Sequence, residues 1–131
     1  MFEAVLFDLD GTLADTAPDL CGAVNILLVE EGRPQQPFSH LRPYTSQGVR
    51  GLLRKGFGIE ASHGEYARLS ARFLEIYAGQ LCDLSRLFDG IPELLDTLES
   101  MHVSWGIVTN KRARYTEPLV AALGLTPRTR C

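Results

Sequence analysis

Residues 3–13 read Glu-Ala-Val-Leu-Phe-Asp-Leu-Asp-Gly-Thr-Leu, an apolar run that ends in an acidic turn. The part from Glu3 to Leu9 is short, rich in β-favouring side chains and without helical spacing, which is typical of a strand buried on both faces. Asp10-Gly11 then supplies two residues that favour turns. The sequence therefore predicts a buried strand over 3–9 and a sharp turn directly after it.

A second run of the same kind covers 103–109, Val-Ser-Trp-Gly-Ile-Val-Thr, and ends at Asn110-Lys111. Apolar residues at helical spacing lie on both sides of it, with Leu94 to Met101 before it and Leu119 to Leu123 after it. Gly124 is placed to stop the second of these helices. Strand, helix, strand, helix is the order of a parallel α/β sheet.

About ninety residues separate the two predicted strands, whereas a crossover between parallel strands needs only a dozen or more. Periodic apolar positions predict three helices in this interval, over 18–32, 46–56 and 63–82, with 33–37 as a loop. We therefore expect an all-helical domain over 15–84, inserted into an α/β core domain formed by 1–14 and 85–131.

Composition limits the function classes open to the chain. Its 131 residues carry a net charge of −3 with scattered basic side chains, which argues against a nucleic-acid partner. Apolar runs such as Ala4–Phe7 are far shorter than the roughly 20 residues of a membrane span. The N-terminus lacks the basic and long apolar regions of a secretory signal, so we expect a cytoplasmic protein with no membrane partner.

Two carboxylates, Asp8 and Asp10, follow the first predicted strand at its C-terminal end, where open parallel sheets bind ligands. Alternation along a strand would place both on one face. Gly11 allows the backbone to turn and to present amide groups to an anion. Clustered carboxylates beside such donors suggest Mg²⁺ bridged to a phosphate, although Asp and Gly also close strands simply as turn formers.

A family resemblance rests on three segments: Phe7-Asp8-Leu9-Asp10-Gly11-Thr12-Leu13, Asp15-Thr16-Ala17-Pro18-Asp19 and Thr109-Asn110-Lys111. With the helical insertion, they resemble the haloacid dehalogenase superfamily, and within it the phosphoglycolate phosphatase-like branch. The resemblance implies a Rossmann-like parallel-sheet core with an inserted helical cap. It also implies a phosphatase, because dehalogenases of the superfamily lack the second aspartate.

The resemblance implies a role for each residue of these segments. Asp8 would attack phosphorus to form an aspartyl-phosphate, and Asp10 would protonate the leaving oxygen and later activate water. Mg²⁺ would be bound by the Asp8 carboxylate and the Asp10 carbonyl. Phosphate would be bound by four residues, Gly11, Thr12, Thr109 and Asn110. Lys111 would either add positive potential near the phosphate or lie at the surface.

Substrate recognition is expected in the insertion, where 44–50 matches the loop that family caps place over the substrate. Gly48 would allow close backbone approach, and Arg50 or Arg54 would bind a substrate carboxylate or lie in solvent as surface charges. The substrate would be a small phosphorylated metabolite. Phosphoglycolate and a phospho-sugar such as N-acetylmuramic acid 6-phosphate stay open as alternatives.

The family pattern continues with a lysine and an acidic pair for which we find no equivalent after Thr109. We therefore expect the N-terminal portion of a longer phosphatase, with a sheet of two strands whose first strand leaves one edge open. The alternative is a non-catalytic fragment that at most binds metal or phosphate weakly, or that associates with another chain. The open edge would also allow self-association.

Overall fold

The computed structural model describes residues 4–128, and the chain forms two compact units. The core unit contains the described residues of 1–16 and 85–131, and the helical unit spans Ala17–Leu84. Parallel strands with helices in the core unit, and helices alone in the interval between, confirm the predicted α/β class with a helical insertion. Within 4–128, no helix is both long and apolar enough to cross a membrane.

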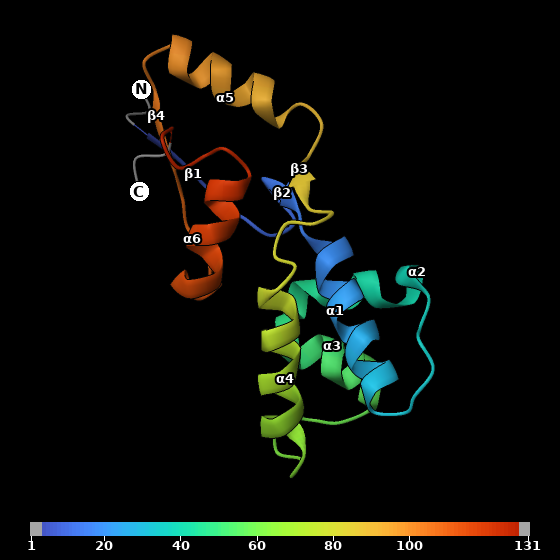
Figure 1. The fold of residues 1–131 in the computed structure, drawn as a ribbon. Helices are drawn as coiled ribbons and strands as arrows, with labels where there is room; N and C mark the ends of the chain where they lie inside the picture. Colours follow the sequence, from blue (N-terminus) through green and yellow to red (C-terminus); the bar gives the residue numbers. More distant parts are fainter. Residues whose placement is uncertain (1–3, 129–131) are drawn as a thin grey trace. The chain divides into compact units, whose positions relative to one another are not determined.

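The core unit is built on two parallel strands, β1 (Ala4–Phe7) and β4 (Ser104–Ile107), which lie side by side in Figure 1. Their register pairs Ala4 with Ser104 and Phe7 with Ile107, which confirms the predicted parallel pairing. Both strands are shorter than the sequence predicts, and Glu3 lies outside the described residues. The first strand ends at Phe7 because the chain already turns at Leu9.

The first strand is not buried on both faces, although its composition is typical of such a strand; this agrees with the expected two-stranded sheet. Residues of β1 alternate between exposed and half-buried, and the Leu6 side chain is 59% exposed. The apolar run is that of an interior strand, but the described residues pair it with one neighbour, so only part of each face is covered. Val108, just beyond β4, is likewise 58% exposed.

Two helices accompany this sheet, α5 (Ile91–Ser100) and α6 (Ala113–Ala122). Both were predicted, and Gly124 follows α6 with a φ of +78°, the left-handed conformation of a C-terminal stop. Trp105 of β4 is 1% exposed, and its ring meets that of Phe7 edge to face with centroids 6.4 Å apart. The core unit thus has an aromatic centre to which each strand contributes one ring.

A second, antiparallel pair of strands was not predicted. Strand β2 (Ala14–Asp15) pairs with β3 (Arg86–Leu87), and the amide of Phe88 donates to the Leu13 carbonyl at 3.0 Å. Two residues are too few for a periodic signal in sequence. The pair joins the segment that enters the helical unit to the segment that returns from it.

The helical unit contains α1 (Ala17–Glu30), α2 (Phe38–Leu41), a 3₁₀ helix η1 (Arg42–Gln47), α3 (Gly48–Phe57) and α4 (Tyr66–Ala78) (Figure 1). The three predicted helices are confirmed as α1, α3 and α4, with ends that differ by a few residues. The short α2 and η1 were missed. The residues that are fully buried between the helices are apolar: Ala23, Val24, Leu27, Leu41, Leu52, Leu53 and Phe73.

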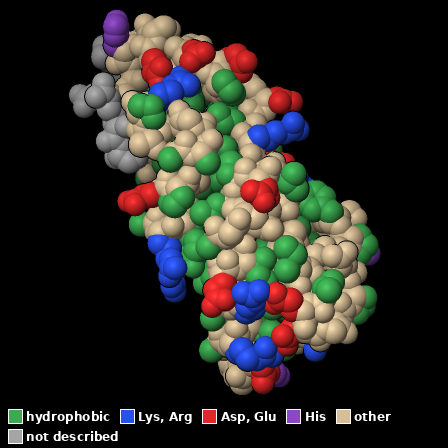
Figure 2. All heavy atoms as spheres, in the orientation of Figure 1, with side chains coloured by type: hydrophobic (Ala, Val, Ile, Leu, Met, Phe, Trp, Pro, Cys, Tyr) green, Lys and Arg blue, Asp and Glu red, His purple; other side chains and the backbone are tan. Residues whose placement is uncertain are grey.

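Ion pairs connect the end of α1 to α4, where Arg72 binds Glu30 at 2.6 Å and Arg68 binds Glu31 at 2.7 Å. Acidic and basic side chains gather over the helical unit (Figure 2). Two acidic residues at a helix C-terminus are unfavourable by themselves, because that end carries partial negative charge. The arginines hold the pKa of both Glu30 and Glu31 below the usual range through these hydrogen bonds.

We expect the stabilisation from these pairs to disappear in acid. A lowered folded-state pKa means that the contribution is complete above the unfolded-state value and is lost as the pH falls through the folded-state value. The double variant Arg68→Gln/Arg72→Gln should therefore melt below the wild type at pH 7, and the two should converge as the pH falls through the lowered folded-state pKa values of Glu30 and Glu31. Thermal unfolding against pH measures this. Arg50→Gln, at an exposed arginine of α3, is the matched control, and a gap that persists in acid would contradict the assignment.

Candidate active site

The loop after β1 is shaped by hydrogen bonds to two carbonyl groups. The Leu9 carbonyl accepts the amides of Leu13 and Ala14, both at 3.1 Å, and that of Thr12 at 3.3 Å. The Gly11 amide donates to the Ala14 carbonyl at 2.8 Å, with Gly11 at a φ of +80°. Leu9 and Leu13 are fully buried and anchor the loop from below. The residues between them are therefore held in a tight turn.

Gly11 contributes to this turn through its backbone conformation, which differs from the role expected of its amide. Its N–H group is already bonded to Ala14, so it is engaged within the loop rather than free to face an anion. A side chain at Gly11 would be strained at this positive φ. Thr12 is exposed, and its amide donates to the Leu9 carbonyl over a long distance of 3.3 Å.

Asp8 stands directly after β1 and is exposed, and its Oδ1 accepts the Leu9 amide at 2.8 Å. The prediction that strand alternation places Asp8 and Asp10 on one face was wrong, because the strand ends at Phe7. The turn at Leu9 decides where the two carboxylates lie. Asp8 keeps an accessible carboxylate at the C-terminal end of a parallel strand, where a ligand can reach it.

Asp10 is held by two donors that come from different parts of the core unit. The Thr16 hydroxyl donates to Asp10 Oδ1 at 2.7 Å, and the Lys111 ammonium lies 3.0 Å from the same oxygen. Thr16 is buried, and the Lys111 side chain is only 10% exposed. Because both donors meet one oxygen, the rotation of the Asp10 carboxylate is restricted.

The second strand end supplies Thr109, Asn110 and Lys111. The ladder continues one residue past β4, because the Val108 amide donates to the Phe7 carbonyl at 2.8 Å. The Lys111 amide then donates to the Thr109 hydroxyl at 3.2 Å, which closes a turn before α6. Thr109 is half-buried and Asn110 is exposed. The two strand ends thus meet, and the pair of Lys111 with Asp10 joins their loops.

The donors at this edge suit a hard cation. The Asp8 carboxylate and the Asp10 main-chain carbonyl offer oxygen ligands, the kind that Mg²⁺ prefers. No group of three or more His, Cys, Asp or Glu side chains within 4–128 could hold a metal ion. At this edge the Asp8 carboxylate and the Asp10 carbonyl are thus the two oxygen ligands that could take part in holding a divalent cation.

The three candidates of the helical unit lie on α3. Gly48 begins the helix with a φ of +66°, and Arg50 is exposed. Arg54 is engaged within its own unit: Nε and Nη2 bind the two oxygens of Glu60 at 2.9 and 3.2 Å, and Nη1 binds Gln47. Arg54 would therefore have to break its ion pair with Glu60 to bind a ligand. Among the described residues, Arg50 has no such ion pair to break.

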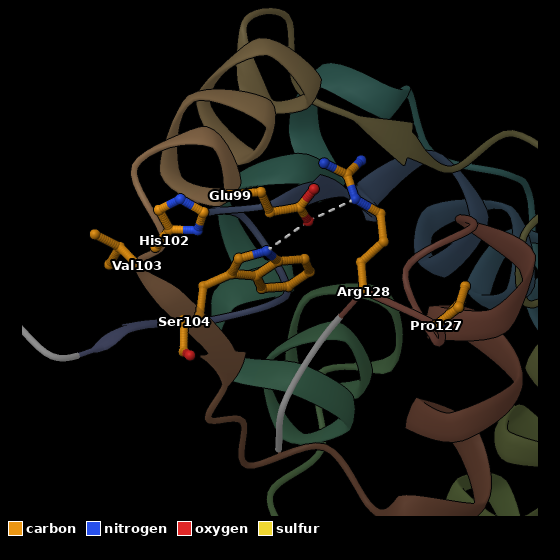
Figure 3. Close-up of a pocket in the computed structure, with 7 residues that line it drawn as sticks. Glu99, His102, Val103, Ser104, Pro127 and Arg128 are labelled. Atoms are coloured by element: carbon orange, nitrogen blue, oxygen red, sulfur yellow. Dashed lines mark hydrogen bonds and ion pairs between the residues drawn. The ribbon is translucent and has the colours of Figure 1, made fainter.

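A pocket of about 420 Å³ in the core unit contains none of the predicted site residues. It is lined by Glu99, His102, Val103, Ser104, Trp105, Pro127 and Arg128 (Figure 3). Its charges bind one another: Glu99 accepts the Trp105 indole N–H at 3.1 Å and an Arg128 N–H at 2.9 Å. Arg128 also binds Asp96 at 2.7 Å. These contacts stabilise the unit rather than form a charged binding site.

Two side-chain contacts of the candidate site were not predicted from sequence. Thr16 precedes a helix with proline in its first turn, which is the ordinary position of a capping residue, so its hydroxyl was not assigned to Asp10. Lys111 was noted, but its partner lies 101 residues away. The parallel pairing of the strands, combined with the side-chain length of lysine, was the signal that could have joined them.

Comparison with known proteins adds independent findings. The model of the haloacid dehalogenase-like hydrolase family matches residues 5–128. N-acetylmuramic acid 6-phosphate phosphatase of Pseudomonas aeruginosa is 40% identical over 98% of this chain and 57% of the relative. Phosphoglycolate phosphatase of Xanthomonas campestris is 42% identical over 92% of this chain and 54% of the relative.

Solved structures agree with the sequence relatives. A crystal structure of a predicted phosphoglycolate phosphatase from Haemophilus somnus matches with a TM-score of 0.84 and 26% identity, over 98% of this chain and 60% of that one. The chain therefore spans about half the length of the curated relatives that it matches.

Proposed function

Since the chain belongs to the haloacid dehalogenase-like hydrolases, we propose that it carries the catalytic aspartates of a phosphatase acting on a small phosphorylated metabolite. The observation that supports this most is the pair of strand ends at one sheet edge, with an accessible Asp8 and a second aspartate fixed by Thr16 and Lys111. An exposed carboxylate beside a restrained one suits two different roles in one reaction.

In the proposed reaction Asp8 attacks the phosphorus atom, so that a bond from its carboxylate oxygen to phosphorus forms while the ester oxygen departs. Asp10 gives its proton to that oxygen, and the leaving group is released as an alcohol. Asp10 then accepts a proton from water as the water attacks the phosphorus of the aspartyl-phosphate. Asp8 is regenerated and inorganic phosphate is released.

Other residues of the same edge support the phosphoryl group. The Thr109 hydroxyl donates to a phosphoryl oxygen, and the backbone at Thr12 and Asn110 adds further donors. We propose that the Asp8 carboxylate and the Asp10 carbonyl hold Mg²⁺. Bound there, the ion offsets the repulsion between a carboxylate and a phosphate dianion.

Two substrates are supported by the relatives, phosphoglycolate and N-acetylmuramic acid 6-phosphate. Each carries a carboxylate besides its phosphate, which an arginine can bind through two hydrogen bonds. We propose that the helical unit selects between them, with Gly48 and Arg50 in the segment that meets the substrate. Arg54 would have to leave Glu60 to take part.

The proposal is tested by phosphate release from a panel that contains both esters and p-nitrophenyl phosphate. We expect turnover with Mg²⁺, its loss on adding EDTA and its recovery with excess Mg²⁺. A phosphodiester is the control, and it should not be hydrolysed because its phosphorus carries one charge fewer and a second ester group. No phosphate release by the wild-type chain from any ester would overturn the proposal. It would favour a non-catalytic chain that self-associates at the open edge of β1, which size-exclusion chromatography would reveal.

A further inference from the structure

Lys111 contacts Asp10 in a way that the reaction described above does not use. Its ammonium lies 3.0 Å from Asp10 Oδ1, and its side chain is 10% exposed against 29% for that of Asp10. A lysine that is this far removed from water is costly unless an anion compensates its charge. The contact is therefore maintained by the burial of the lysine as well as by the attraction between the two groups.

The backbone of Lys111 is fixed as firmly as its side chain. Its amide donates to the Thr109 hydroxyl at 3.2 Å, and its carbonyl accepts the Thr116 hydroxyl at 3.1 Å from within α6. The lysine thus extends from a turn that is held at both its amide and its carbonyl. Because this backbone is fixed, the Lys111 side chain loses less conformational entropy when it binds Asp10.

Both donors of Asp10 contact the same oxygen, so the two oxygens of the carboxylate differ in their hydrogen bonding. Oδ1 accepts hydrogen bonds from Lys111 and Thr16 and is held in place. Neither of these two donors contacts Oδ2, which is the oxygen left to face a ligand.

From this geometry we propose that Lys111 is a positioning residue, which orients Asp10 so that Oδ2 faces the ester oxygen. This assignment rests on the proposed phosphatase function. It differs from the role of a phosphate ligand, in which the ammonium would bind the phosphoryl group. The two roles make different predictions, because a positioning residue affects proton delivery and a phosphate ligand affects binding.

The leaving group of the substrate separates these roles. An alkyl ester such as phosphoglycolate needs a proton on its departing oxygen, whereas p-nitrophenolate departs without one. We expect Lys111→Met to lower kcat/KM for phosphoglycolate about 100-fold and for p-nitrophenyl phosphate less than about 5-fold, because general acid catalysis contributes on this scale. The parameter kcat/KM reports the steps up to the phosphorylated enzyme, where the leaving group departs.

Three further variants complete the test. Lys111→Arg should restore part of the lost rate on phosphoglycolate, because it keeps a cation in reach of Oδ1. Arg112→Met removes a neighbouring exposed charge and should leave both rates unchanged. Asp10→Asn should reproduce the substrate dependence of Lys111→Met, and adding Lys111→Met to it should cause little further loss.

A second measurement does not depend on turnover. In thermal unfolding of the ligand-free chain, Lys111→Met and Asp10→Asn should be non-additive, because each removes the same contact. Additive effects would overturn the assignment, and so would an equal loss of rate on the two esters or a raised KM with unchanged kcat. No turnover by the wild type is a different result, since it would overturn the proposed phosphatase function and this assignment together.

Discussion

Replacing Asp8 by asparagine is expected to reduce phosphate release by at least about 1,000-fold, the scale of losing a covalent nucleophile. The amide has the shape of the carboxylate but neither its charge nor its nucleophilic oxygen. Its carbonyl oxygen can still accept the Leu9 amide, which the wild-type Oδ1 accepts at 2.8 Å. The loop should therefore keep its conformation, and the loss should be confined to chemistry.

Steady-state phosphate release and mass spectrometry measure this result together. After rapid acid quenching, the wild type should carry the added mass of one phosphoryl group, and Asp8→Asn should not. Asp83→Asn, at an exposed aspartate of the helical unit, removes the same charge and should leave turnover unchanged. Turnover by Asp8→Asn within about tenfold of the wild type would assign the nucleophile to another residue.

The second large effect concerns stability and is expected at Trp105. Its side chain is 1% exposed, meets Phe7 edge to face and donates its indole N–H to Glu99 at 3.1 Å. Trp105→Ala should lower the free energy of unfolding by about 3–5 kcal/mol, the usual cost of truncating a buried tryptophan. Urea titration followed by circular dichroism measures the change.

Trp105→Phe is the matched control for this prediction. Phenylalanine keeps much of the buried apolar surface and the contact with Phe7, but it cannot donate to Glu99. Its cost should be smaller, at about 1–2 kcal/mol, because one hydrogen bond and part of the ring are lost. A cost below about 1 kcal/mol for Trp105→Ala would show that the aromatic centre does not stabilise the core unit.

Sequence predicted the parts of the fold that carry long or repeated signals. The apolar face of α1 runs through Leu20, Val24 and Leu27, and this periodicity located the helix well. The parallel pairing of β1 and β4 followed from the order of elements. Short elements such as β2 and α2 were missed, because a few residues show no period and tertiary contacts decide their conformation.

The burial of β1 differs from that typical of its composition for a related reason. The apolar composition of β1 is suited to a strand with a neighbouring strand on each side. The exposure of Leu6 reflects the single strand that pairs with β1 within the described residues. Composition and burial agree only where every face of a strand is covered.

At the candidate site, sequence indicated Asp8 and Asp10 by type and spacing, and the family resemblance added Thr109 and Asn110; these assignments stay predictions. The sequence did not reveal the contact of Lys111 with Asp10, because the order of the elements predicts that the strands pair in parallel but fixes neither their register nor the rotamer of a long side chain. It also overestimated Gly11, whose amide is engaged inside the loop. Residue types indicate chemistry, but hydrogen bonds decide which groups remain available for it.

The chain enters and leaves the helical unit at a single place. Ala14–Asp15 pairs with Arg86–Leu87 in the core unit, and within the helical unit the buried Asp19 carboxylate accepts the Leu84 amide at 3.0 Å. Segments whose ends lie together can be lengthened, trimmed or exchanged with little disturbance of their host. Insertion, deletion or exchange of helices between these two segments should therefore leave the aspartate loop unaltered, so that the two parts of the chain can change independently during evolution.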